Sequence, residues 1–357
     1  MTKNPPNMHA YSAYEKKRKK RITAIVLLFA LLLVLIPFMT TIGSVAIPFN
    51  TVWRILIAKI LFLKETAPID IASNITTIVI DIRLPRIILA GLVGGGLAVA
   101  GATYQGIFRN PLADPCLLGV SQGAALGAVA SFFVPAFLLA GGTTPLLAFA
   151  GAIIAVAVVY LLARVDSALP VTTLILAGVA LGAFLAAATS YLILVSGEHL
   201  HGIILWLMGG FWMTEWDEVQ TVFPLVACGI TVIVLFSRTL NVMQLDEEQA
   251  TQLGINVERA KITLLVAASL ITAAAVCFCG VIGFVGIIIP HMVRLVWGPD
   301  YRFLVPLSAL TGAIFLVVAD AAARSAFSQE IPIGILTAFT GAPFFLYILR
   351  RKRKTLC

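Results

Sequence analysis

The sequence predicts an all-α integral membrane protein with about ten transmembrane helices. Hydrophobic residues make up 60% of its 357 residues and charged residues only 12%, whereas about a quarter of the residues in a soluble domain are charged. The apolar residues are gathered in long charge-free runs, and about 20 such residues cross a bilayer as one helix. Because the hydrocarbon core offers no water to backbone groups, we expect these spans to be helical.

Ten spans result when the longest charge-free runs are divided at turns. The run 115–163 breaks at "VPAFLLAGGTTP", whose glycines and prolines favour a turn, and the run 262–293 breaks near "CGVIGFVG". The run 167–197 is one span that begins at "ALPVTT". The predicted spans are centred near residues 34, 97, 127, 154, 184, 228, 271, 289, 313 and 341.

The basic residues predict that both termini are cytoplasmic. "KKRKKR" precedes the first span and "RRKRK" follows the last, and loops that stay in the cytoplasm carry an excess of Lys and Arg. Two cytoplasmic ends require an even number of spans, which ten satisfies. The chain is thus divided into a basic N-terminal tail (1–21), a transmembrane domain (22–350) and a basic C-terminal tail (351–357). This topology accounts for the net charge of +8, so no nucleic-acid partner is expected.

Motifs typical of cofactors and metals are weak in this chain. The "CFC" pair (Cys277 and Cys279) lacks CxxC spacing and a histidine partner, so packing is the favoured role. The glycine-rich run "AGLVGGGLAVAGATYQG" matches neither GxGxxG nor GxxxxGK[ST], and its small residues suit close helix packing. We therefore expect no metal, no cofactor and no catalytic role for this chain.

Two polar segments interrupt the apolar pattern on the predicted cytoplasmic side. In segment 241–261, Asp246 and Gln249 match a capping box and Gly254 fits a helix end, while Asn256 can cap a second short helix. In "RNPLADPCLLG" (109–119), each proline disfavours a helical residue before it, which predicts a rigid turn between the second and third spans.

Several long motifs, in order along the chain, resemble one family of membrane proteins. "RNPLADPCLLGVSQGAALGA", "LWLMGGFW", "QLGINVERAK", "GVIGFVGIIIPHMVRLVWGPDYRFLVP" and "EIPIGILTAFTGAPFFLYIL" resemble the FecCD-type permease subunits of ABC importers for iron chelates, heme and vitamin B12. The likeness runs from about residue 40 to residue 350. It implies a type II ABC importer permease fold in the cell membrane, a homodimer, two cytoplasmic ATPase subunits and a soluble substrate-binding protein on the outer face.

The resemblance also implies roles for particular residues. A binding protein would dock on Arg83, Arg86 and Arg324. The ATPase would rest on a coupling segment, 241–261, at Asp246, Glu247, Glu248, Leu253, Gly254 and Ile255. Candidates near the inner gate are Asn110, Pro111, Asp114, Pro115, His291 and Arg294, and candidates at the outer mouth are Met208, Gly209 and Gly210.

From the residues alone, simpler interpretations of these sites stay open. An arginine at a helix mouth also serves as an anchor that reaches to water, and Arg324 also has the spacing to pair with Asp320. His291 and Arg294 also fit anchoring at the inner membrane edge, and the tryptophans of "LWLMGGFWMTEW" fit an interfacial aromatic belt.

The function implied by the resemblance is ATP-driven import of a bulky metal chelate, with ATP hydrolysed on a separate subunit. An iron-siderophore is the favoured substrate, and cobalamin or heme are alternatives that the sequence does not separate. An ion-coupled secondary transporter generally needs ionisable groups or broken helices at the membrane midplane, and the central parts of these spans contain no Asp, Glu, Lys or Arg. A channel or scaffold would leave the coupling segment without a purpose.

Overall fold

The computed structural model describes residues 8–353, except residues 44, 61–72, 135–142, 167–168, 213, 246 and 327–328. Its elements are helices, in the order α1 (Met8–Thr40), α2 (Phe49–Ile60), α3 (Ser73–Thr77), the π-helix η1 (Ile78–Arg83), α4 (Leu84–Ile107), the 3-10 helix η2 (Pro115–Leu118), α5 (Val120–Ser131), α6 (Thr143–Ala163), α7 (Val171–Leu194), the 3-10 helix η3 (Gly197–His199), α8 (Leu200–Met208), α9 (Trp216–Leu235), α10 (Ser237–Val242), α11 (Glu247–Gln252), α12 (Val257–Cys279), α13 (Val285–Trp297), α14 (Tyr301–Ser325) and α15 (Ile333–Arg353).

The predicted all-α membrane fold is confirmed. Each of the ten predicted span centres falls within a separate helix, namely α1, α4, α5, α6, α7, α9, α12, α13, α14 and α15. Within the described residues, 7 helices are long and apolar enough to cross a membrane. The helices α13 and α15 are shorter apolar helices, and α5 has 12 residues. The short α5 follows from the polar turn before it, which uses residues that the sequence assigned to the span.

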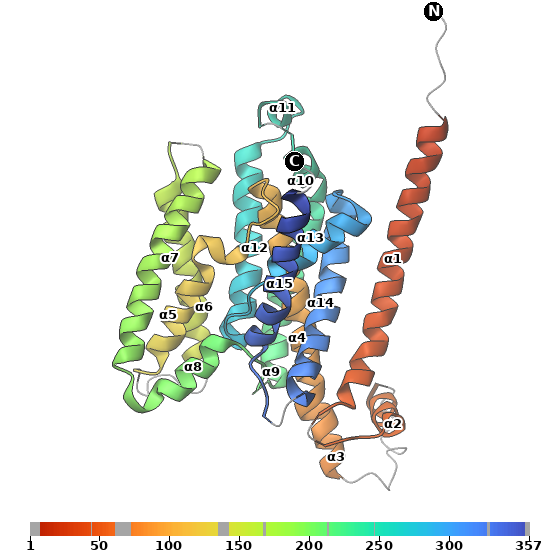
Figure 1. The fold of residues 1–357 in the computed structure, drawn as a ribbon, viewed down its shortest axis with the longest axis vertical. Helices are drawn as coiled ribbons and strands as arrows, with labels where there is room; N and C mark the ends of the chain where they lie inside the picture. The colour runs from red at the N-terminus through yellow and green to blue at the C-terminus, as the bar shows by residue number, and fades with distance from the viewer. Residues whose placement is uncertain are drawn as a thin grey trace, which may run out of the picture.

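The helix α4 lies at the centre of the bundle (Figure 1), where it packs against α9, α12, α13 and α14. Of its most apolar window, 83% is buried, compared with 11% for α1. Glycines allow this packing, because a Cβ added at Gly101 would overlap the carbonyl of Gly286 and one at Gly94 would overlap that of Gly312. The glycine-rich run is thus a packing surface, as expected.

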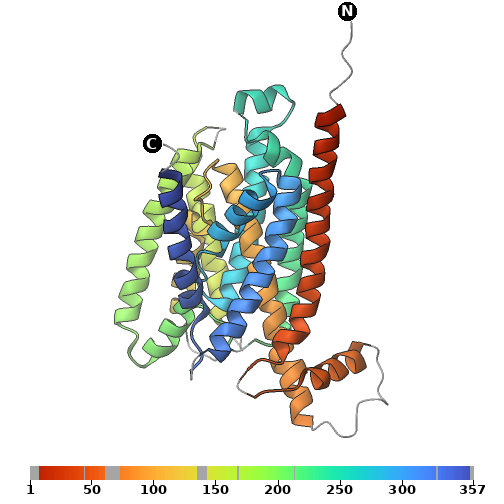
Figure 2. The ribbon, with the colours of Figure 1, turned by 45° about the vertical axis from the view of Figure 1, so that its right-hand side comes forward.

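The two ends of the bundle carry different small elements (Figure 2). The helix α11 projects from the end where α1 begins and α15 ends, and α2 and α3 lie at the opposite end. We call these the α11 end and the α2 end. Both described chain ends therefore lie on one side, which is the arrangement that the two terminal basic clusters predict; that this side is cytoplasmic stays a prediction.

One helix boundary differs from the sequence analysis. The helix α1 is continuous from Met8 to Thr40, so the described part of the basic tail and the first span form one helix. Asn256 does act as an N-cap, but it caps the 23-residue α12, so the expectation of a second short helix was wrong. The physical reason is that Val257, Ala260 and Lys261 are already buried and continue directly into the span.

Candidate functional site

The polar turn after α4 is held by its own side chains. Asn110 and Asp114 each accept a hydrogen bond from the backbone N–H two residues further on, at 3.0 and 2.7 Å. Pro115 then opens η2, and Gly119 begins α5 in the left-handed conformation, with φ of 76°. Short local hydrogen bonds of this kind replace helical ones and fix the turn.

The same turn is bonded to the coupling segment. Arg109 donates from Nε to the Met243 carbonyl at 2.8 Å, and Gln244 donates from Nε2 to the Gly106 carbonyl at 3.1 Å. The end of α4 and the start of the coupling segment are therefore joined by two reciprocal side-chain contacts. The sequence analysis did not single out Arg109 or Gln244 for this, because the contacts join residues more than 130 positions apart.

The coupling segment exposes its tip beyond the α11 end of the bundle (Figure 1). Leu253 is 64% exposed, Glu248 is exposed and Ile255 is half-buried. Gly254 has a φ of 82° with open space around its Cβ position, so the backbone conformation itself favours glycine there. Asp246 and the side chain of Glu247 lie outside what the structure describes, and their predicted roles stay predictions.

The coupling segment is also bonded to the segment before α7. Glu258, in the first turn of α12, accepts the Leu169 backbone N–H on Oε2 at 2.9 Å and pairs with Lys261 through Oε1 at 3.0 Å. Lys261 is 3% exposed. A cavity of about 380 Å³ opens beside Glu258 and is shared with Glu248 and Ile255. The surface around the tip is therefore acidic and apolar.

Asp300, between α13 and α14, connects three further segments at the α11 end. It accepts a hydrogen bond from Asn241 at 2.8 Å and pairs with Arg302 at 2.7 Å and with Arg21 of α1 at 3.6 Å. Burial alone would raise the pKa of Asp300, but the hydrogen bonds from Arg302 and Asn241 outweigh it and hold the pKa below its ordinary value. The carboxylate therefore stays charged and fixes Asn241, the first residue of the coupling segment.

The remaining inner-gate candidates lie on α13. His291 is 7% exposed, and Arg294 donates to the Tyr301 hydroxyl at 3.3 Å. Pro115 of the polar turn packs on the same helix, close to the Cβ position of Gly286. The structure thus brings the turn together with α13, and the gating role of these residues stays a prediction.

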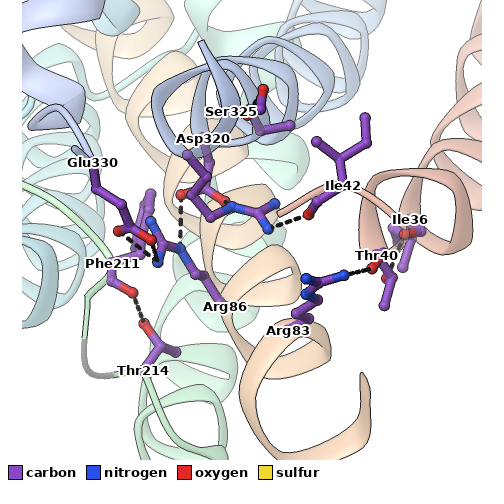
Figure 3. Close-up of polar contacts among 12 residues, drawn as sticks. Ile36, Thr40, Ile42, Arg83, Arg86, Phe211, Thr214, Asp320, Ser325 and Glu330 are labelled. Carbon is purple, nitrogen blue, oxygen red and sulfur yellow. Dashed lines mark hydrogen bonds and ion pairs between the residues drawn. The ribbon is translucent and has the colours of Figure 1, made fainter. Parts of the chain in front are cut away.

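At the α2 end, two of the three outer arginines share one carboxylate (Figure 3). Asp320 is fully buried; its Oδ1 accepts from Arg86 Nε and its Oδ2 from Arg324 Nε, both at 2.9 Å. Arg86 also pairs with Glu330 at 3.1 Å, and Arg324 donates to the Ile42 carbonyl at 2.7 Å. The pairing of Arg324 with Asp320 that the spacing allowed is confirmed.

The third outer arginine is held by backbone carbonyls. Arg83 donates to Thr40 and Thr41 at 2.9 and 3.3 Å and also to Val45, so it closes the connection that follows α1 (Figure 3). Arg83, Arg86 and Arg324 are only 5%, 9% and 9% exposed. All three are therefore engaged within the chain, and their docking role stays a prediction. The side chain of Glu330, 43% exposed, is the accessible member of the cluster, and the sequence analysis missed it.

The outer-mouth candidates follow a nine-residue helix. The helix α8 ends at Met208, which is 40% exposed, and Gly209 reverses the chain with a φ of 70°. The Gly209 carbonyl accepts Ile333 N–H at 2.9 Å, and Gly210 N–H donates to the Cys279 carbonyl at 2.8 Å. The end of α8 is thus tied to the end of α12 and the start of α15, and the outer-mouth role of these residues stays a prediction.

Comparison with known proteins identifies the family. The model of the FecCD transport family matches residues 30–351. The chain is 48% identical to the cobalamin import system permease protein BtuC of Halobacterium salinarum, over 81% of this chain and 78% of that protein. It is 40% identical to the Fe(3+) dicitrate permease protein FecD of Escherichia coli, over 77% and 86%, and 37% identical to the hemin permease protein HmuU of Yersinia pestis, over 92% and 95%.

A solved structure shows the same fold. An inward-facing metal-chelate-type ABC transporter superposes with a TM-score of 0.78 at 31% identity, over 92% of this chain and 98% of that one. Together with the seven long apolar helices, these matches make the chain a multi-pass membrane protein of the permease type. On its sequence, its fold and its relatives, the chain belongs to the FecCD transport family.

Proposed function

We propose that the chain is the permease subunit of an ATP-driven importer for a bulky metal chelate. Two copies would form the pathway, two ATPase subunits would bind the α11 end, and a soluble binding protein would dock on the α2 end. The α11 end would then be cytoplasmic. The observation that carries the proposal is that the coupling segment, which exposes its tip at Leu253, is bonded at its start to the polar turn through Arg109 and Met243.

The coupling segment has three connections along which motion of an ATPase would travel. Arg109 and Gln244 lead to the end of α4, Glu258 leads to the segment before α7, and Asn241 leads through Asp300 to α14. An exposed apolar residue such as Leu253, at a left-handed glycine turn, suits insertion into a groove of a partner. Movement of this segment would therefore displace three elements together.

The docking of the binding protein is proposed to use Arg86 first. A guanidinium can hold a carboxylate through two parallel hydrogen bonds. At present Nη1 of Arg86 alone donates to both oxygens of the exposed Glu330, at 3.1 and 3.4 Å. A carboxylate on the binding protein would compete with Glu330 for this position. Arg83 and Arg324 would then contribute mainly by holding the surrounding segments and by their positive charge.

The substrate is proposed to be a ferric siderophore, with cobalamin as the second candidate. The family resemblance favours the first, while the 48% identity to a permease named for cobalamin favours the second. Relatives named for iron citrate and for hemin have 40% and 37% identity. All of these are large metal chelates, so the class is common to the relatives named.

Reconstitution in liposomes tests the proposal. Liposomes that contain the chain, its ATPase and its binding protein would be given labelled ferric siderophore, cobalamin or hemin, each chelate in a separate experiment. Each chelate would be supplied inside the liposomes in one sample and outside them in another. We expect uptake of one chelate class that requires ATP and persists when a protonophore collapses the proton gradient. Uptake driven by an ion gradient without the ATPase would contradict the proposal and favour a secondary transporter.

A further inference from the structure

The helix α1 carries a cluster of lysines that the transport function does not use. Lys16, Lys19 and Lys20 are all exposed and lie in the part of α1 that precedes the family match, which begins at residue 30. Residues three and four apart share one face of a helix. The three ammonium groups therefore form one patch, which we call the lysine patch.

The lysine patch faces away from the bundle. At 3.6 residues per turn, Lys16 and Lys20 lie on the same side of α1 as Leu27 and Val34, which are 64% and 63% exposed. Lys19 lies on the side of Val26, which is 60% exposed. Apolar side chains this exposed on a membrane-spanning helix face acyl chains, so the patch stands directly over the lipid-facing surface of α1.

The depth of the patch matches the headgroup layer. The apolar part of α1 begins at Ile22, immediately after the lysines, and Lys20 stands about 10 Å of helix from Leu27. A lysine side chain at this position places its ammonium group among lipid phosphates. An acyl chain from the same lipid would then run along Leu27 and Val34.

The opposite side of α1 is bonded to the bundle near the lysine patch. These bonds prevent α1 from rotating the patch away from the lipid. Arg21 donates from Nε to the Trp297 carbonyl at 2.7 Å, pairs with Asp300 at 3.6 Å and lies 5.2 Å from the centre of the Phe303 ring. Tyr14 accepts a hydrogen bond from Arg302 at 3.2 Å. Contacts two turns apart thus fix the rotation of α1 about its axis.

The positive charge of the lysine patch favours an anionic ligand. Like charges three and four residues apart destabilise a helix unless an anion neutralises them, and Glu15, four residues before Lys19, offsets at most one of the three. We propose that the lysine patch binds the phosphate of an anionic phospholipid in the leaflet at the α11 end, with an acyl chain along Leu27 and Val34. This site is independent of the proposed transport function, since it needs neither substrate nor partner subunits.

Native mass spectrometry of the purified full chain tests this site. The protein would be equilibrated with equal amounts of phosphatidylglycerol and phosphatidylcholine that carry the same acyl chains. We expect phosphatidylglycerol to be retained about tenfold more than phosphatidylcholine, and this preference to disappear in the Lys16→Gln, Lys19→Gln, Lys20→Gln variant. Excess inorganic phosphate should not displace the lipid, because it supplies no acyl chain.

Two control variants separate the site from general charge effects. Arginine at positions 16, 19 and 20 keeps the charge and should keep the preference, and Arg54→Gln with Lys59→Gln removes exposed charges from α2, at the opposite end, and should also keep it. Equal retention of the two lipids by the wild-type chain would overturn the proposal. Salt-sensitive capture of an acidic protein by the lysine patch, with no lipid preference, would also overturn it.

Discussion

Arg86 and Arg324 donate to opposite oxygens of a single buried carboxylate, that of Asp320, at 2.9 Å each. The two arginines come from α4 and α14, so Asp320 bonds these central helices together at the α2 end. Breaking a buried ion pair by removing one partner costs about 3–5 kcal/mol, because a charge is left unpaired. Asp320 therefore controls the stability of the bundle more strongly than any single exposed charge.

The first prediction concerns this carboxylate. Asp320→Asn keeps the size of the side chain but removes the carboxylate that pairs with Arg324 and leaves Arg86 with only the exposed Glu330. We expect the free energy of unfolding in detergent to fall by about 3–5 kcal/mol. The matched control is Glu330→Gln, which removes a carboxylate that is 43% exposed and should cost about 1 kcal/mol or less. Equal losses in the two variants would contradict the central role of Asp320.

The second prediction uses Glu330 to test docking. If Glu330 competes with a binding-protein carboxylate for Arg86, then Glu330→Gln should raise the affinity of the binding protein by up to about fivefold, since an exposed pair is worth up to about 1 kcal/mol. The affinity should also fall as salt rises. Titration of the purified transporter across ionic strengths measures both. An affinity that falls in Glu330→Gln would show that Glu330 itself takes part in docking.

Much of the architecture was predictable from local patterns. The span centres, the break near "CGVIGFVG", the helix end at Gly254 and the cap at Asn256 follow from hydropathy and backbone preference within a few residues, and each was confirmed. The pairing of Arg324 with Asp320 was visible because the two stand one helical turn apart.

The contacts between distant segments were not predictable in this way. Arg86 also binds Asp320, and Arg109 binds Met243, across 234 and 134 positions. Such contacts depend on which helices pack together. Residues such as Gly101 and Gly286 determine this packing, because their lack of a side chain lets two helices approach closely. Charged residues at the ends of spans indicated that each needed a hydrogen-bonding or ionic partner, but hydropathy does not specify which residue that partner is.

The third prediction concerns the bond between the polar turn and the coupling segment. Arg109→Ala removes the donor to Met243, so motion of the coupling tip should reach α4 less directly. We expect ATP hydrolysis to continue while transport per ATP falls about tenfold, equivalent to roughly 1.4 kcal/mol of coupling. The control is Arg164→Ala, since Arg164 donates to the carbonyl of the nearby Asp166 at 3.0 Å. Unchanged transport per ATP in Arg109→Ala would exclude this connection.

The fourth prediction tests the glycine turn at the coupling tip. Gly254 has a φ of 82° and open space around it, so Gly254→Ala changes only the backbone preference. An alanine in the left-handed conformation costs about 1–2 kcal/mol. We expect the tip to change its shape to relieve this strain, and the changed shape should weaken capture of the ATPase. Gly197→Ala is a matched control, because Gly197 has a φ of 54° and equal space but lies before α8. Equal ATPase capture in both variants would remove the turn from the interface.

The fifth prediction concerns the pH dependence of the Asp300 connection. Because the folded state lowers the pKa of Asp300, its stabilisation is present above the ordinary carboxylate pKa and is lost as pH falls through the folded value. Asp300→Asn should therefore destabilise the protein at pH 7 but differ less from wild type near pH 3. Unfolding of both proteins at the two pH values measures this. A difference that grows at low pH would reverse the assignment.

The separation of Arg86 and Asp320 along the chain has a consequence for biosynthesis. The ribosome adds roughly 5–20 residues per second, so the 234 positions between them correspond to about 10–50 s of translation. During that interval α4 waits in or beside the membrane with its guanidinium unpaired, and the long arginine side chain can reach the lipid–water boundary. The most deeply buried of the long apolar helices thus acquires its permanent neighbour α14 only late in synthesis.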